Sequence, residues 1–184
     1  YYSNGYYENA LYYFQAAKRL NANVLGKRTN FFISNCVFAM DEICNPVAFN
    51  PENLGKNINT ELEEYLPAIS VDGNTLVFTR RIVEKNYIPQ EDFYISTRNE
   101  EGDWQEALAY PGAINTARSE GAFFFSADKE IVVYTACNRD DGQGRCDLYL
   151  MLNNTTHNAG KIINTKHWES QGCFSPDGKY LYFV

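Results

Sequence analysis

The sequence predicts a mixed, mainly β fold in which a short α-helical N-terminal segment is followed by repeated antiparallel strands. Within the first 45 residues, apolar side chains recur at the spacing of an amphipathic helix. From residue 58 onward the pattern changes to the period-two alternation of strands, and one stretch recurs three times. Aromatic residues make up 15% of the chain, which favours strands with half-buried faces.

Residues 1–45 predict two helices. Apolar side chains share one face of the first helix, at Tyr7, Ala10, Leu11, Phe14 and Ala17. The stretch 21–23 (Asn-Ala-Asn) is expected to break the helix, with Gly26 in the turn and a second helix over 30–44 that Pro46 prevents from continuing.

The first helix has a recognisable pattern, Gly-x-Tyr-x-x-Ala-x-x-x-Phe, over residues 5–14. This pattern resembles the first helix of a tetratricopeptide repeat, in which a small Ala lets the partner helix approach. A generic helical hairpin is the alternative. Residues 46–57 are rich in Pro, Asn and Gly and read as a linker that contains turns. We therefore expect a helical hairpin over 1–45, a linker over 46–57 and a β-region over 58–184.

The repeated stretch begins with Ile-Asn-Thr at residues 58, 114 and 163. Each copy has a Glu six residues after the Ile, a Ser at twelve and an Asp at fourteen. These residues are Glu64, Glu120 and Glu169, then Ser70, Ser126 and Ser175, then Asp72, Asp128 and Asp177. Gly73 and Gly178 follow the Asp in two copies and predict tight hairpin turns. Lys129 takes the place of this Gly in the middle copy, which predicts a changed turn.

The strands expected from the alternation number four in each of the first two copies and two in the third. They are 66–70, 76–81, 92–97 and 104–108, then 122–126, 131–137, 147–152 and a weak strand over 156–162. Four short antiparallel strands in a repeat of about 50 residues are typical of a β-propeller blade. About two and a half blades are present, whereas a closed ring needs ~4–8, so the sequence predicts an incomplete propeller.

The repeated polar residues have two interpretations. Three carboxylates at equivalent positions could line a channel or bind cations. The structural interpretation is favoured because a scaffold residue recurs with its repeat, whereas a catalytic site is normally unique. An Asp before Gly builds the turn, and the Ser can satisfy amides at the strand end. The Glu is expected to bond the backbone of a neighbouring blade.

Several function classes find little support in the sequence. A net charge of −7 argues against a nucleic-acid partner. The two His residues lie near no Gly-x-Ser-x-Gly elbow, and the chain contains neither a phosphate-binding Gly-rich loop nor a dinucleotide fingerprint. We predict no catalytic residues, no cofactor and no metal ligands, and hence a protein that is not an enzyme.

The five Cys residues contain no Cys-x-x-Cys pair, which argues against a zinc site. Cys137 and Cys146 flank an Asp- and Gly-rich loop between two predicted strands. A hairpin would bring them within reach of a disulfide, which would imply an oxidising compartment such as a periplasm. Two free, partly buried thiols are the alternative.

Motifs along nearly the whole chain resemble one group of proteins. Residues 173–183, in which Ser-Pro-Asp-Gly-Lys is followed by alternating aromatic positions, resemble the TolB-type propeller repeat. The stretches at 45–55, 64–67, 78–81, 91–96, 120–122 and 146–149 resemble periplasmic proteins with tetratricopeptide repeats, a TolB-type propeller and often a C-terminal OmpA-like peptidoglycan-binding domain. Some are lipoproteins of type nine secretion and gliding systems, the PorE-like group. Lys129, Gly172 in the place of Pro67, and a shortened second blade depart from the pattern.

The resemblance implies a non-catalytic scaffold in the periplasm, associated with the outer membrane and with other envelope proteins as partners. It further implies a link from a secretion or gliding complex to peptidoglycan, made by a region outside this chain. The chain begins without Met and ends within a predicted strand, so we expect a piece of a longer protein. The alternatives are a propeller that accompanies or gates a hydrolase, and a propeller that binds glycans or peptides through aromatics such as Trp104 and Trp168.

Overall fold

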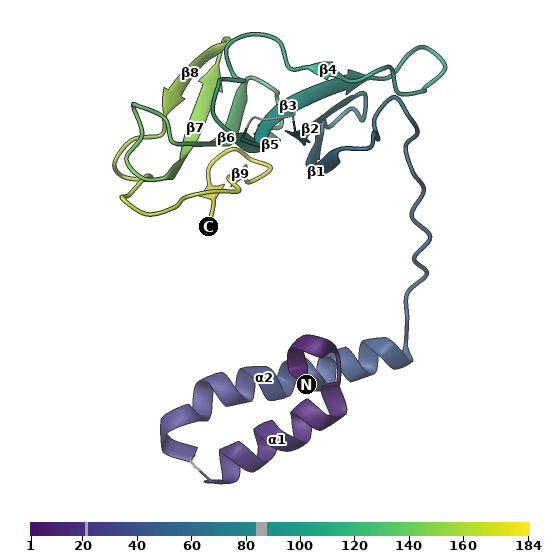
Figure 1. Ribbon diagram of the computed structural model, residues 1–184, viewed down its shortest axis with the longest axis vertical. Coiled ribbons are helices and arrows are strands. Elements are labelled where there is room, and N and C mark those ends of the chain that lie inside the picture. Colours follow the sequence, from purple (N-terminus) through teal and green to yellow (C-terminus); the bar gives the residue numbers. More distant parts are fainter. Residues whose placement is uncertain (21, 84–87) are drawn as a thin grey trace. The chain divides into compact units, whose positions relative to one another are not determined.

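The structure, a computed structural model, describes residues 1–20, 22–83 and 88–184. The chain forms two compact units, Tyr1–Glu52 and Asn53–Val184. The first unit contains the helices and the second contains the strands (Figure 1). The fold is therefore mixed and mainly β, as the sequence predicts.

The helical unit consists of a short 3-10 turn and two antiparallel α-helices, η1 (Tyr2–Asn4), α1 (Tyr7–Leu20) and α2 (Ala22–Cys44). The prediction that the second helix begins at Asn30, with Gly26 in the turn, is wrong. The backbone is already helical at Ala22, and Gly26 lies inside α2. Glycine disfavours a helix by about 1 kcal/mol relative to Ala, but packing against a partner helix commonly outweighs such a preference.

Aromatic rings fill the space between the two helices. Phe14 of α1 stacks on Phe32 of α2 with ring centroids 5.1 Å apart, and Tyr2 meets both rings edge-on. Ala10 and Cys36 are buried in the same unit. The small side chain at Ala10 thus lies where the sequence places a close approach between helices.

The first four-stranded sheet, called blade 1, has the order β1-β2-β3-β4 and is antiparallel throughout. Its strands are β1 (Glu63–Ile69), β2 (Thr75–Ile82), β3 (Gln90–Thr97) and β4 (Leu108–Ala109). The fourth strand was predicted over 104–108, and it is shorter and later than that. Trp104 still forms an isolated bridge with Arg98, but Asn57 interrupts the ladder after it. The carbonyl of Asn57 accepts the amide of Ala107, and its side chain donates to the carbonyl of Trp104.

The second sheet, called blade 2, has the order β5-β6-β7-β8 and the same antiparallel pairing. Its strands are β5 (Glu120–Phe125), β6 (Ile131–Cys137), β7 (Cys146–Leu152) and β8 (Thr155–Asn158). The predicted fourth strand over 156–162 ends early because the amides of Ile163 and Asn164 turn back to the carbonyl of Gly160. A third copy contributes β9 (Cys173–Phe174) and β10 (Leu181–Tyr182), which pair with each other.

Blades 1 and 2 pack face to face, and the main hydrophobic core lies between them. Strand β5 contacts β1, β2 and β3, and the two sheets lie side by side in Figure 1. Val77 and Phe93 of blade 1 meet Val132, Tyr134 and Tyr149 of blade 2 in one buried cluster. The central strand β2 is buried on both faces, because its Leu76 and Phe78 pack in a second cluster with Ile58 and Ala107. This stacking of four-stranded blades gives the unit its propeller-like architecture.

The turn between the first two strands of each copy has one geometry, including the middle copy in which a changed turn was predicted. The amides of Gly73, Lys129 and Gly178 each donate to the carbonyl of the Ser three residues earlier. Lys129 adopts a φ of 64°, close to the 72° and 68° of the two glycines. The middle turn is unchanged because Lys129 adopts the left-handed conformation.

Among the described residues, none of the helices is both long enough and apolar enough to cross a bilayer.

Candidate functional site

The first two copies of the repeat have a bulge at the same place in the first strand, and the third copy has the same unusual backbone there. The pairing of β1 with β2 shifts register between Tyr65 and Ala68, and that of β5 with β6 shifts between Gly121 and Phe124. The eighth residue after the repeat Ile has a positive φ in all three copies: 50° at Leu66, 57° at Ala122 and 55° at Gln171. Such backbone is uncommon for residues other than glycine and costs of order 1–3 kcal/mol. Its recurrence marks the bulge as a fixed feature of the repeat.

The two bulges and the equivalent segment of the third copy meet around one open pocket of about 190 Å³. Its lining comes from consecutive copies of the repeat, namely Leu66 and Pro67, then Ala122, Phe123 and Phe124, then Gln171, Gly172 and Cys173. The third copy approaches blade 2 so closely that a Cβ at Gly172 would lie 2.7 Å from Cγ2 of Val133. A glycine is therefore needed where the wall of this pocket meets blade 2.

The pocket is suited to binding rather than to acid–base chemistry. Of its eight lining residues, Cys173 is the one with a titratable side chain, and the remainder are apolar except for Gln171. A general acid or base must lie within hydrogen-bond reach of the reacting atom, and this lining supplies no carboxylate or imidazole. The volume is below the ~300–1,000 Å³ of typical small-molecule sites and suits one or two apolar side chains.

The repeated Glu residues lie at or near the start of the first strand of each copy. Each one bonds to the Ile-Asn-Thr segment that precedes it in the same copy. Glu120 accepts hydrogen bonds from the amide and the hydroxyl of Thr116, and Glu64 and Glu169 do the same with Thr60 and Thr165. The sequence-based expectation that the Glu bonds a neighbouring blade does not match these partners. Each Glu instead bonds to the Thr of its own Ile-Asn-Thr, which lies only four residues earlier in the chain.

The Ser and Asp residues close the turns of their own copies. Ser70 donates to Oδ1 of Asp72 at 2.5 Å and accepts the amide of Thr75. Ser126 and Ser175 make the equivalent pairs with Asp128 and Asp177. These bonds hold the pKa of Asp128 and Asp177 below the usual range, and a bond from Lys129 does so first for Asp72. Each carboxylate is engaged in its own turn.

Sequence reasoning missed the residue that joins one blade to the next. Asn115 accepts the amide of Phe93 and donates to its carbonyl, so it ties the start of blade 2 to β3. Asn164 makes the same two bonds with Leu148 of β7. The recurrence of Asn as the second residue of Ile-Asn-Thr was the signal that could have found this role.

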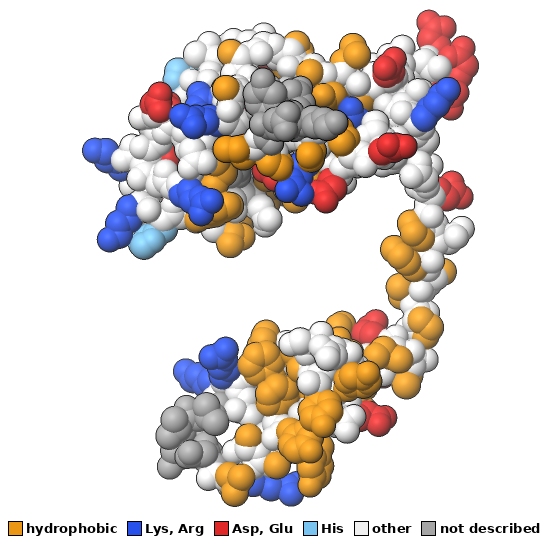
Figure 2. All heavy atoms as spheres, in the orientation of Figure 1, with side chains coloured by type: hydrophobic (Ala, Val, Ile, Leu, Met, Phe, Trp, Pro, Cys, Tyr) orange, Lys and Arg blue, Asp and Glu red, His pale blue; other side chains and the backbone are white. Residues whose placement is uncertain are grey.

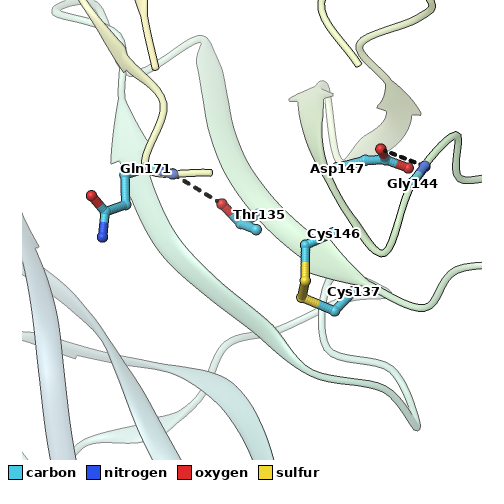
Figure 3. Close-up of a disulfide and its surroundings, with 6 residues drawn as sticks. All are labelled: Thr135, Cys137, Gly144, Cys146, Asp147 and Gln171. Carbon is cyan, nitrogen blue, oxygen red and sulfur yellow. Dashed lines mark hydrogen bonds between the residues drawn. A yellow bond between two sulfur atoms is a disulfide. The ribbon is translucent and has the colours of Figure 1, made fainter. Parts of the chain in front are cut away.

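A disulfide joins Cys137 to Cys146 across the end of the β6–β7 hairpin (Figure 3). The same end of the hairpin carries the contact with the third copy, because the carbonyl of Cys146 accepts the amide of Glu169. The amide of Gln171 donates to Oγ1 of Thr135 one strand away, as Figure 3 also shows. The disulfide therefore lies beside the junction of blade 2 with the third copy.

Comparisons with known proteins give limited information. Neither a scan of protein-family models nor a search of curated proteins finds a match. Among solved structures, the chain is similar to TolB from Acinetobacter baumannii, with a TM-score of 0.47 and 16% sequence identity over 68% of this chain. The alignment spans 27% of that TolB chain, about a quarter of its length.

Proposed function

We propose that this protein is a non-catalytic interaction scaffold of the bacterial cell envelope. In this proposal the pocket lined by Leu66, Phe124 and Gly172 holds apolar side chains of an extended segment of a partner protein. The observation that carries the proposal is the convergence of three equivalent positive-φ segments on one apolar pocket. A strained backbone that recurs beside an open pocket is typical of a binding feature.

The position of the bulges supports an extended partner. Strands β1 and β5 are the edges of their sheets, and the bulge interrupts their ladders at Leu66 and at Ala122. An edge strand offers backbone groups to an added strand, while pockets between the strands receive its alternate side chains. Leu66 and Phe124 are 39% and 37% exposed, so apolar contact area is available there.

The helical unit supports an interaction role independently. Large apolar side chains on α1 and α2 are exposed, among them Tyr12, Tyr13, Phe31 and Phe38, and Figure 2 shows hydrophobic side chains gathered over this unit. Exposed apolar surface of this kind marks a site of association in soluble proteins.

The envelope location rests on two supports. A disulfide persists in an oxidising compartment such as the periplasm, and the repeat motifs resemble those of periplasmic propeller proteins. In line with that resemblance, we propose outer-membrane association and a role in a secretion or gliding complex, with peptidoglycan bound by an OmpA-like domain of the parent protein. Other envelope proteins are the proposed partners of this chain.

The pocket can be tested by site-specific photo-crosslinking in cells that make the protein. A photoreactive residue at Phe124 is expected to form a crosslink with one discrete envelope protein, which mass spectrometry identifies. Leu66→Asn should weaken this crosslink severalfold because it removes apolar surface from the pocket, while Asn tolerates the left-handed backbone at this position.

The matched control is Ile69→Thr, which changes an exposed apolar residue on the same strand outside the pocket lining. Its crosslink should equal that of the wild type. Equal crosslinking in the Leu66→Asn and Ile69→Thr variants would contradict a role for the pocket. Turnover of a substrate that is lost on a point change in this unit would contradict the scaffold as a whole.

A further inference from the structure

The repeated Glu is buried in the second and third copies and nearly so in the first, where it has a cationic partner. Nε of Arg80 lies 3.0 Å from Oε1 of Glu64, and both side chains are 9% exposed. The guanidinium group lies 4.1 Å from the ring centroid of Tyr94 and donates to the carbonyl of Ile58. Arg80, Glu64 and Tyr94 form what we call the cation cluster of blade 1.

Blade 2 has an equivalent cluster that is built from a different position in the sequence. Ala136 occupies the position in blade 2 that Arg80 occupies in blade 1, so the repeat position itself supplies no cation there. The cation comes instead from Arg139, in the loop between β6 and β7. Its Nη1 lies 3.7 Å from Oε1 of Glu120, and its guanidinium group lies 5.1 Å from the ring of Tyr149. Tyr149 pairs with Tyr134 as Tyr94 pairs with Phe78.

Glu120 depends on this cation because it is the most deeply buried of the three carboxylates. Its side chain is 0% exposed, and burial raises its pKa although Thr116 and Arg139 act in the opposite direction. Removal of the cationic partner of a buried carboxylate strongly destabilises the folded state. The contact with Arg139 is also looser than that of blade 1, since Nη1 of Arg139 is buried and makes no hydrogen bond within the described part of the chain.

The loop that carries Arg139 is held at its base by the disulfide. Cys137 and Cys146 face each other at the last pair of the β6–β7 ladder, two residues before Arg139. The amide of Asn138 donates to the carbonyl of Arg145, and Asp147 accepts the amides of Gln143 and Gly144; Figure 3 shows the last of these bonds near the disulfide. Arg80 by contrast belongs to β2 itself, so its position needs no such clamp.

We propose that the Cys137–Cys146 disulfide is a redox-sensitive clamp that holds Arg139 against Glu120 and fixes the junction of blade 2 with the third copy. A dithiol reductant would break the S–S bond, giving two electrons and two protons to form the thiols of Cys137 and Cys146 while becoming a cyclic disulfide itself. The freed loop then releases Arg139. It also loosens the bonds from Arg145 to His167 and from Glu169 to Cys146.

The test compares the cost of removing the cation in the two redox states. In a chain with Cys36→Ala, Cys44→Ser and Cys173→Ser, which prevents exchange with other thiols, urea unfolding is measured with and without dithiothreitol. Arg139→Met should raise the unfolding equilibrium constant by about tenfold or more in the oxidised protein and by less than about threefold in the reduced protein. Arg80→Met is the matched control and should cost the same in both states.

A second measurement is needed if the reduced protein is too unstable for urea unfolding. Under native conditions, exchange of the amide hydrogens of Arg145 and Glu169 should accelerate by about tenfold on reduction, while amides of the β2–β3 ladder keep their rates. Equal costs of Arg139→Met in both states would overturn the proposal. So would unchanged exchange at Arg145 and Glu169 on reduction.

Discussion

At the scale of single residues, the polar positions of the repeat divide into local and long-range roles. Ser70 and Asp72 close a turn within their own copy, and Glu64 holds a loop of that copy. Asn115 and Asn164 instead reach the preceding blade, where each satisfies an amide and a carbonyl of the third strand. Buried backbone groups need such partners, so this Asn joins consecutive blades.

Asn59 is the equivalent Asn of the first copy and has no such partner across a blade boundary among the described residues. Its side chain accepts the amide of Leu54 instead. We expect Asn164→Ala to lower the free energy of unfolding by about 1–3 kcal/mol, because it leaves the buried amide of Leu148 without this partner, while the carbonyl keeps its bond from Ala159. Asn59→Ala should cost less than about 1 kcal/mol, because Leu54 is exposed. Urea unfolding of both variants provides the measurement, and equal losses would refute the division of roles.

At the scale of elements, the bulge determines how the first strand of each blade is built. Pro67 lies within the bulge of β1, where the missing amide breaks no ladder bond. The equivalent positions hold Phe123 and Gly172, so proline is not required for the bulge. The residues with positive φ, Leu66, Ala122 and Gln171, also differ in size, and Gln171 differs from the other two in polarity. The bulge is therefore imposed by the packing of the repeat and not by a local preference.

Substitutions at Leu66 test whether its backbone is strained. Leu66→Asn should leave the free energy of unfolding within about 0.5 kcal/mol of the wild type, because Asn adopts the left-handed conformation readily. Leu66→Val keeps an apolar side chain but should cost about 1–2 kcal/mol, because a β-branched residue resists positive φ. Thermal or urea unfolding of the two variants decides the matter. A Val variant as stable as the Asn variant would show that this position is relaxed.

At the scale of the whole molecule, the sequence was informative where a pattern is periodic. Two helices and the order of the strands follow from apolar spacing, and strand 131–137 matches β6 at both ends. The errors have a common cause, which is contact between distant residues. The bonds of Asn57 to Trp104 and Ala107 shift β4, and helix packing extends α2 through Gly26.

The candidate site was beyond reach of the sequence for the same reason. The pocket forms only when Leu66, Phe124 and Gly172, which lie about 50 residues apart in the chain, come together. The cluster of Arg139 with Glu120 likewise replaces an arginine of blade 1 that lies at another position of the repeat. Aligning the repeats places Ala136 opposite Arg80. The alignment therefore gives no sign that Arg139 supplies the equivalent cation in blade 2.

The division into two compact units predicts where the native chain is cut first. Residues 46–55 lie in neither a helix nor a strand, and Phe49 within them is 85% exposed. Exposed aromatics such as Tyr12 and Phe38 belong to helices, whose hydrogen-bonded backbone resists entry into a protease. Brief treatment with chymotrypsin should therefore cleave after Phe49, and mass spectrometry should find fragments 1–49 and 50–184. Phe49→Ala should slow this cleavage about tenfold or more, whereas initial cleavage at Tyr12 or Phe38 would show that the helical unit opens before the segment between the units is cut.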